Sequence, residues 1–526
     1  MEAPTRDRKP FQLRTNLDFA EMSKMSKEFA DVNQDIEDCE AEVHRLQSHI
    51  MFLQNHRQRL DEYKTCLRSL MSPIRKLPNE LVLRIFDCAC TINDLTTGKL
   101  ATMPALTISC VCTHWQDLAK STPQLWSRIR VNLTAMRLDR PEFPILEFYL
   151  DLAQQLPLTV EVLGDKLETL EPIQAAVCAT LGACSDRWKE LIVSQPTFYK
   201  ALMAQDSRNF PMLDALTISN FGFRLPGSLD RFHDAPRLHS LSVLSFPLGK
   251  LHKSNFPWKE LNVLNICSYS EELKHLVEAP SNLKVLCFCE WEDGHYKPNS
   301  PPTTAPSVEA LSLSVNSQTT HPKSENMMDV VLTSMTLPAL TSLSIDRLDI
   351  ADEYQLDWPK ETLEGFLCRS SCQLTTLSIK SIPMSDSDLI DLLLRLPSLL
   401  HLTIDDSKVT TRSPITTRLV QNLHAFRYRG KSFISPVMVH KLQSLSLTFS
   451  GFGSFDDRTF VDVVSSRWYS RGYPHTSEIG VNSLRSVVMR FLNRDVDPGI
   501  YSPLKHLEKD GMRVVIIAKG KVLQSL

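Results

Sequence analysis

Glycine is scarce in this sequence, with 16 glycines among 526 residues. The glycine-containing motifs of phosphate loops and of hydrolase nucleophile turns do not occur, and the zinc motif His-Glu-x-x-His is also missing. The sequence therefore predicts no cofactor site and no catalytic metal site. We expect a protein that is not an enzyme.

An excess of charge of one sign and long apolar runs are also lacking. The formal net charge is −3 and the isoelectric point is near 6.6, so total charge gives no reason to expect nucleic acid as a partner. No run approaches the roughly 18 apolar residues that a membrane span needs, and the first ten residues lack the apolar stretch of a secretion signal. We expect an intracellular protein, cytoplasmic or nuclear or both.

Cysteine, in contrast, is present 13 times. In a reducing compartment these residues are expected to be free thiols. Three closely spaced pairs occur, namely Cys88/Cys90, Cys110/Cys112 and Cys287/Cys289. The first two pairs leave a structural zinc site as the alternative, although paired zinc ligands usually have two residues between them.

The first regular pattern lies in residues 21–71, after a polar segment, residues 1–20, that we expect to be a disordered tail. Apolar residues recur there at alternating intervals of three and four, from Met22 through Ile36 and Ile50 to Leu67, with Arg57 and Lys64 as interruptions. No proline or glycine occurs in residues 11–72. This heptad pattern predicts a long α-helix that forms a coiled coil, because a narrow apolar seam is stable only when it is covered. A second copy of the chain is one possible cover, and this chain itself is another.

Residues 72–131 predict a small group of helices with more apolar surface than they can bury. Pro78 favours a helix start, and apolar residues including Leu81 and Ile85 then follow at helical spacing. A second helix follows Pro104, with Val111 and Trp115 on its apolar face. Two or three short helices cannot hide all these side chains among themselves, so we expect a partner protein to cover them.

This segment resembles the F-box, in the form common in large fungal F-box families. The resemblance rests on the order and spacing of Leu-Pro, Ile-Phe and Trp in residues 72–131. It departs from the family in a longer gap at residues 91–103 and in a less basic sequence around Trp115. The F-box is an all-α module that binds the Skp-type adaptor of cullin-based ubiquitin ligases. The resemblance implies the adaptor-binding residues Leu77, Pro78, Leu81, Ile85, Phe86, Val111, Trp115 and Leu118.

The rest of the chain divides into two predicted parts. Residues 132–186 predict a helical linker, with one strand-like alternation at residues 158–162. In residues 187–526 a theme of the form Leu-x-x-Leu-x-Ile recurs, mostly at intervals of about 22 to 25 residues. Clear copies begin at Leu213, Leu238, Leu261, Leu283, Val308, Leu340, Leu374, Leu399 and Leu442. This pattern is typical of leucine-rich repeats, which predicts an α/β solenoid with a curved parallel sheet.

The combination is similar to F-box proteins with leucine-rich repeats. It implies a substrate-recognition subunit of a cullin-based, SCF-type ubiquitin ligase, whose repeats bind an unknown target protein. The alternative is a dimeric scaffold that has no role in ubiquitin transfer.

Overall fold

The computed structural model describes most of the chain. The described residues are 19–136, 143–165, 167, 169–204, 209–219, 229–243, 255–267, 282–290, 301–315, 327–347, 358–409, 412–425, 437–451, 454–468, 481–519 and 521–524. Contacts between Cα atoms divide the chain into two compact units, Met1–Ile85 and Phe86–Leu526. Most of the predicted tail, residues 1–18, lies outside the described residues.

The first unit is dominated by the helix α1 (Phe19–Leu70), which has 52 residues. At a rise of 1.5 Å per residue it is about 78 Å long. The unit continues with the 3₁₀ helix η1 (Pro73–Lys76) and the first part of α2 (Asn79–Ala89). The predicted long helix is confirmed, and none of its residues is buried. Its pairing in a coiled coil remains a prediction.

The second unit is built on one sheet. Among the described residues it has 16 strands, and every neighbouring pair from β1 to β17 is parallel, whereas β18 is antiparallel to β17. The strands in spatial order are β1 (Asn93–Asp94), β2 (Arg128–Asn132), β3 (Leu158–Leu163), β4 (Trp188–Val193), β5 (Ala215–Ile218), β6 (Ser240–Val243), β7 (Val263–Ile266), β8 (Val285–Cys289), β10 (Ala310–Val315), β12 (Ser342–Arg347), β13 (Thr376–Lys380), β14 (His401–Asp405), β15 (Ser444–Phe449), β16 (Ser486–Phe491), β17 (Arg513–Ala518) and β18 (Lys521–Gln524). The short strands β9 (Thr303–Thr304) and β11 (Met335–Thr336) form a separate pair.

The register of the sheet follows the repeated sequence theme. Leu216 of β5 is level with Leu241 of β6, which is level with Leu264 of β7, and all three side chains are buried. Successive side chains of a strand point to opposite faces, so one face of each repeat strand is apolar and covered. The predicted leucine-rich-repeat solenoid is therefore confirmed.

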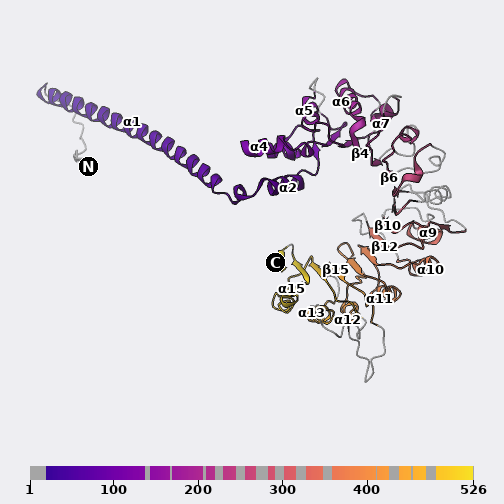
Figure 1. The fold of residues 1–526 in the computed structure, drawn as a ribbon. Coiled ribbons are helices and arrows are strands. Elements are labelled where there is room, and N and C mark those ends of the chain that lie inside the picture. Colours follow the sequence, from indigo (N-terminus) through magenta and orange to yellow (C-terminus); the bar gives the residue numbers. More distant parts are fainter. Residues whose placement is uncertain are drawn as a thin grey trace. The chain divides into compact units, whose positions relative to one another are not determined.

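Helices cover the buried face of the sheet. They lie on the outer side of the curved row of strands, as α9 to α13 show in Figure 1. Several begin with proline at the first turn, where its missing N–H costs nothing. The helices of this unit after α2 are α3 (Pro104–Ser109), α4 (Thr113–Lys120), α5 (Pro144–Leu152), α6 (Pro172–Ala183), α7 (Pro196–Met203), α9 (Met327–Ser334), α10 (Lys360–Ser370), α11 (Asp386–Leu394), α12 (Thr417–Asn422), α13 (Asp457–Ser466) and α15 (Leu504–Lys509). In the parts of the chain that the structure describes, no helix is both long and apolar enough to cross a membrane.

The sheet begins earlier in the chain than the sequence predicted. Strand β1 lies in the long gap at residues 91–103, and Asn93 is level with Ile129 of β2. Residues 132–186, expected to be a helical linker, contribute β3 between β2 and β4. The sheet is therefore continuous across the domain boundaries expected at residues 131 and 186. Strand β3 lies between these boundaries and pairs with β2, which spans the first, and with β4, which follows the second.

Candidate functional site

The helix α2 starts where the sequence predicted a helix entry. The N–H groups of Leu81 and Val82 donate to the carbonyl oxygen of Pro78, at 3.0 and 3.2 Å. Leu77, just before, is extended and ends the 3₁₀ helix η1. The Leu-Pro pair thus marks the turn from one short helix into the next and sets the direction of α2.

One side of α2 presents large apolar side chains to solvent. Leu77, Leu81 and Ile85 are spaced by four residues and expose 37%, 51% and 45% of their surface, and Pro78 is also exposed. Val82, in contrast, is buried. Leucine and isoleucine gain free energy when they leave water, and exposed apolar clusters of this kind mark protein-interaction sites.

Phe86 has a different environment from the three exposed residues. Its side chain is only 1% exposed, and its ring packs edge to face on the indole of Trp115 in α4, with ring centroids 4.8 Å apart. Trp115 itself is half-buried. The Ile-Phe pair therefore separates into an exposed Ile85 and a Phe86 that joins α2 to α4.

The remaining predicted residues lie on α4 and on the turn before it. Val111 follows α3, and its side chain is 57% exposed. Leu118 is half-buried on α4. The end of α4 is held by Trp126, whose indole N–H donates to the carbonyl of Ala119 at 2.8 Å. Val111 is thus the most accessible of the predicted residues in the second unit.

Asn93 is a residue that the sequence did not single out. It is fully buried, and its amide group donates to the carbonyl oxygens of Leu125 and Arg128 at 2.8 and 3.1 Å. Its side-chain oxygen accepts from the N–H of Ala105 at 3.0 Å and lies 3.3 Å from the hydroxyl of Tyr149. The only signal in the sequence is a polar residue between apolar Ile92 and Leu95.

The cysteine pairs do not form a metal site in the part of the chain that the structure describes. No three or more His, Cys, Asp or Glu side chains gather there so that they could hold a metal ion. Cys90 is buried, and burial raises the pKa of its thiol to about 11. A thiol with such a pKa stays protonated at neutral pH and is a poor nucleophile and metal ligand.

The solvent face of the sheet carries a row of small side chains. At equivalent register positions of successive strands lie Thr217, Ser242, Asn265, Cys287, Ser312, Ser344, Ser378, Thr403 and Ser446. All are half-buried. Because these side chains are short, another chain could approach this row of the sheet closely.

A comparison with protein families identifies one domain of this chain. Residues 74–132 match the family model described as F-box-like. The chain carries an F-box-like domain followed by leucine-rich repeats. No curated protein sequence matches the chain.

Solved structures of low sequence identity also align with the chain. An internalin (inlF) from Listeria monocytogenes is 16% identical over 67% of this chain and 84% of its own, with a TM-score of 0.30. A leucine-rich-repeat protein from Leptospira interrogans is 15% identical over 74% of this chain and 91% of its own, with a TM-score of 0.25.

Proposed function

We propose that this protein is a substrate-recognition subunit of a cullin-based, SCF-type ubiquitin ligase, of the kind that fungal F-box families supply. The observation that carries the proposal is the exposed row of Leu77, Leu81 and Ile85 within the F-box-like match. F-box domains generally bind Skp-type adaptors, and cullin is reached through the adaptor. The chain would perform no bond chemistry itself.

The predicted adaptor-binding residues divide into two roles in this proposal. The exposed side chains, Leu77, Pro78, Leu81, Ile85 and Val111, enter the interface. Each fully buried leucine or isoleucine contributes about 1.5–3 kcal/mol from the loss of apolar surface. Phe86, Trp115 and Leu118 keep the helices packed together. Phe86 does so from the buried interior, and the half-buried Trp115 and Leu118 do so from the edge of the adaptor contact.

The solenoid is the proposed binding site for the target protein. Its row of small side chains, most of them hydroxyl-bearing, offers hydrogen-bond donors and acceptors on a rigid sheet. Holding the target near the ligase makes ubiquitin transfer a matter of proximity. The location would be the cytoplasm, the nucleus or both, where adaptor and cullin are found.

Pull-down of a purified Skp-type adaptor by the full-length chain tests the proposal. We expect Leu81→Asp and Ile85→Asp each to lower adaptor affinity by at least about a hundredfold, because a charge would replace a buried apolar contact. Leu394→Asp is the matched control, since Leu394 of α11 is equally exposed, at 48%, outside the F-box-like domain. Unchanged adaptor binding by both F-box variants would refute the assignment.

A dimeric scaffold without a ligase role is the second candidate. The observation in its favour is the apolar seam of α1, none of whose residues is buried. A chain that is dimeric in solution but does not bind the adaptor would support this candidate over the first.

A further inference from the structure

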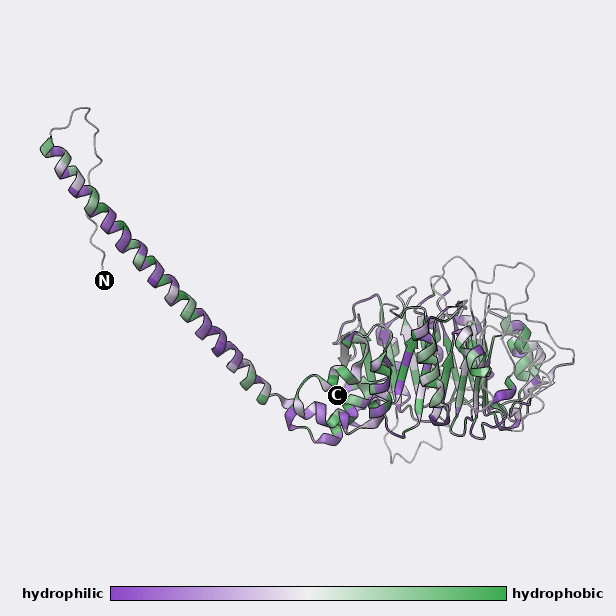
Figure 2. Cartoon of the chain, turned by 90° about the horizontal axis from the view of Figure 1, so that it is seen from above, coloured by the Kyte–Doolittle hydropathy of each residue, from purple (hydrophilic) through white to green (hydrophobic). Residues whose placement is uncertain are grey.

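The helix α1 carries two rows of mainly apolar positions, interrupted only by Arg57 and Lys64, and none of its residues is buried. Figure 2 shows hydrophobic residues recurring along the whole helix. In heptad terms, the a positions are Met22, Phe29, Ile36, Val43, Ile50, Arg57 and Lys64. The d positions are Met25, Val32, Cys39, Leu46, Leu53, Leu60 and Leu67. The central a positions hold β-branched residues and most d positions hold leucine. Two rows in every seven residues make a narrow apolar stripe, the seam of a coiled coil rather than the wider face of a helix that packs on a globular core.

The charges of α1 are strongly asymmetric along its length. Residues 19–44 contain eight carboxylates and two lysines, whereas residues 45–70 contain five arginines or lysines and two carboxylates. The first half of the helix is therefore acidic and the second half basic. Two such helices attract each other when they run in opposite directions and repel when they run in the same direction.

The two basic residues in the seam, Arg57 and Lys64, also favour an antiparallel pair. In a parallel pair in register, Arg57 would face Arg57 of the second copy, and Lys64 would face Lys64. In an antiparallel pair, an a residue faces a d residue. The register that places Val43 opposite Leu46 then places Arg57 opposite Val32, with Asp35 beside it, and Lys64 opposite Met25. Glu28 lies beside Met25 in this arrangement, so each seam cation gains a carboxylate neighbour.

This antiparallel register also uses the whole helix. It aligns Phe19 of one copy with Leu70 of the other, so all seven a positions meet d positions and neither end overhangs. Ile50 then faces Cys39. With both rows covered, the seam loses the solvent exposure that the single chain shows, which the hydrophobic effect favours.

We propose that α1 joins two copies of this chain through an antiparallel, two-stranded coiled coil. The two Leu70 residues, where the chains leave the coil, would then lie about 75 Å apart. The two F-box-like domains of the dimer would therefore start from opposite ends of the coil. The inference does not depend on adaptor binding.

The mass of the full-length chain in solution is the first measurement. We expect twice the 59.8 kDa of one chain. Leu46→Asp combined with Leu53→Asp places charges in the seam and should give the monomer, and because both residues are exposed in the single chain the rest of the fold stays intact. Met51→Asp is the control, since Met51 is an exposed apolar residue of α1 outside the seam. A monomeric wild type, or a mass above that of a dimer, overturns the proposal.

Disulfide trapping determines the direction of the two helices. Cys39 is at a d position and faces Cys39 of the other copy only in a parallel pair. We expect mild oxidation to cross-link the Ile50→Cys variant through Cys39 and not to cross-link the wild type at Cys39. The double variant Ile50→Cys with Cys39→Ser should not form this cross-link. Any cross-link that remains in the double variant comes from other thiols. A wild-type cross-link that Cys39→Ser abolishes would show a parallel pair and overturn the proposal.

Charge exchange gives an independent readout of the same geometry. We expect Arg57→Glu with Lys64→Glu to weaken the dimer by about tenfold or more, because like charges then lie together. Glu28→Lys with Asp35→Lys in the same chain should restore the affinity. In a parallel pair the first two changes only replace one like-charge contact by another, so an unchanged dimer affinity contradicts the antiparallel arrangement.

Discussion

The side-chain oxygen of Asn93 accepts a hydrogen bond at 3.0 Å from the backbone N–H of Ala105, and both residues are fully buried. Asn93 belongs to β1, the edge strand of the sheet, and Ala105 belongs to α3, and both lie within the F-box-like match at residues 74–132. The same amide group donates to the carbonyls of Leu125 and Arg128. One side chain thus ties the helices of the F-box-like domain to the edge of the repeat sheet.

Replacement of Asn93 by leucine is therefore expected to be destabilising. The change leaves the buried N–H of Ala105, the buried carbonyl of Leu125 and the part-buried carbonyl of Arg128 without the side-chain partner, and each buried group left unpaired costs about 1–3 kcal/mol. We expect the free energy of unfolding of this end of the solenoid to fall by about 3 kcal/mol or more, measured by urea denaturation. Asn422→Ala is the control, because half-buried Asn422 donates to the carbonyl of Arg418 within its own helix. Equal stability of Asn93→Leu and the wild type would contradict the role of this residue.

The repeat array was predictable from the sequence because its physical cause is periodic. Each repeat strand buries every second residue, so the theme that begins at Leu238 yields buried Leu241 and Val243 at the expected positions. The long helix α1 was predictable for a similar reason, since heptad spacing without proline or glycine favours one helix.

The packing of the F-box-like helices onto the edge of the repeat sheet could not be predicted from a periodic pattern. Strand β1 has only two residues, Asn93 and Asp94, which is too short for an alternating pattern. The different environments of Ile85 and Phe86 were also not visible. Both are apolar neighbours in one helix, and only the packing of Phe86 on Trp115 separates a core residue from a surface residue.

These environments give a prediction that distinguishes stability from binding. We expect Phe86→Ala to lower the free energy of unfolding of the F-box-like domain by about 3–5 kcal/mol, because it leaves a cavity beside Trp115. Ile85→Ala should leave thermal stability unchanged and weaken adaptor binding, since its side chain is exposed in the single chain. Calorimetry and adaptor titration of the two variants provide the comparison. Loss of stability in Ile85→Ala but not in Phe86→Ala would reverse the assignment of the two residues.

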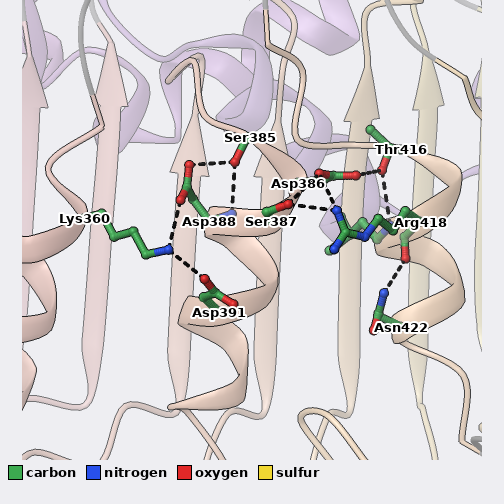
Figure 3. A network of polar contacts seen from close by, with 10 residues as sticks. Lys360, Ser385, Asp386, Ser387, Asp388, Asp391, Thr416, Arg418 and Asn422 are labelled. Carbon is green, nitrogen blue, oxygen red and sulfur yellow. Dashed lines mark hydrogen bonds and ion pairs between the residues drawn. The ribbon is translucent and has the colours of Figure 1, made fainter.

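The outer helices are joined by a polar network that Figure 3 shows. The ammonium of Lys360 in α10 lies 2.6 Å from the carboxylate of Asp391 and 3.2 Å from that of Asp388, both in α11. The hydroxyl of Ser385 accepts from the N–H of Asp388 at 3.1 Å and donates to its carboxylate at 2.6 Å, which caps α11. The Ser385 hydrogen bond, and then Lys360, hold the pKa of Asp388 below its ordinary value.

This depressed pKa predicts a dependence of stability on pH. Because the folded state favours the ionised carboxylate, the contribution of Asp388 is complete above its unfolded pKa of about 4 and is lost as the pH falls through the lower, folded value. We expect Asp388→Asn to lower Tm by about 1–2 °C at pH 7, and this difference should disappear in acid. Asp462→Asn, at an exposed position of α13, should match the wild type throughout. A Tm difference that persists at low pH would exclude this cause.

The C-terminal repeats depend on a buried arginine at the end of α13. Arg467 is 1% exposed, and its guanidinium group donates to the carbonyl oxygens of Leu423, of Val439 at 3.1 Å and of Met438 at 2.7 Å. These carbonyls come from two segments outside α13. A different nitrogen of the planar guanidinium group, Nε, Nη1 or Nη2, meets each of the three carbonyls, whereas lysine would have to reach all three from one ammonium nitrogen.

We therefore expect both Arg467→Met and Arg467→Lys to destabilise the C-terminal repeats, the first by about 3 kcal/mol or more because it leaves buried carbonyls without a donor. Repeats contact mainly their neighbours, so the loss should stay local. Hydrogen exchange is expected to accelerate in β15 and β16 and to remain slow in β2 to β4, with adaptor binding unchanged. Arg458→Met, at an exposed position of α13, is the matched control. Uniformly faster exchange along the whole sheet would instead show that the solenoid unfolds as a single cooperative unit and that the effect of Arg467 is not local.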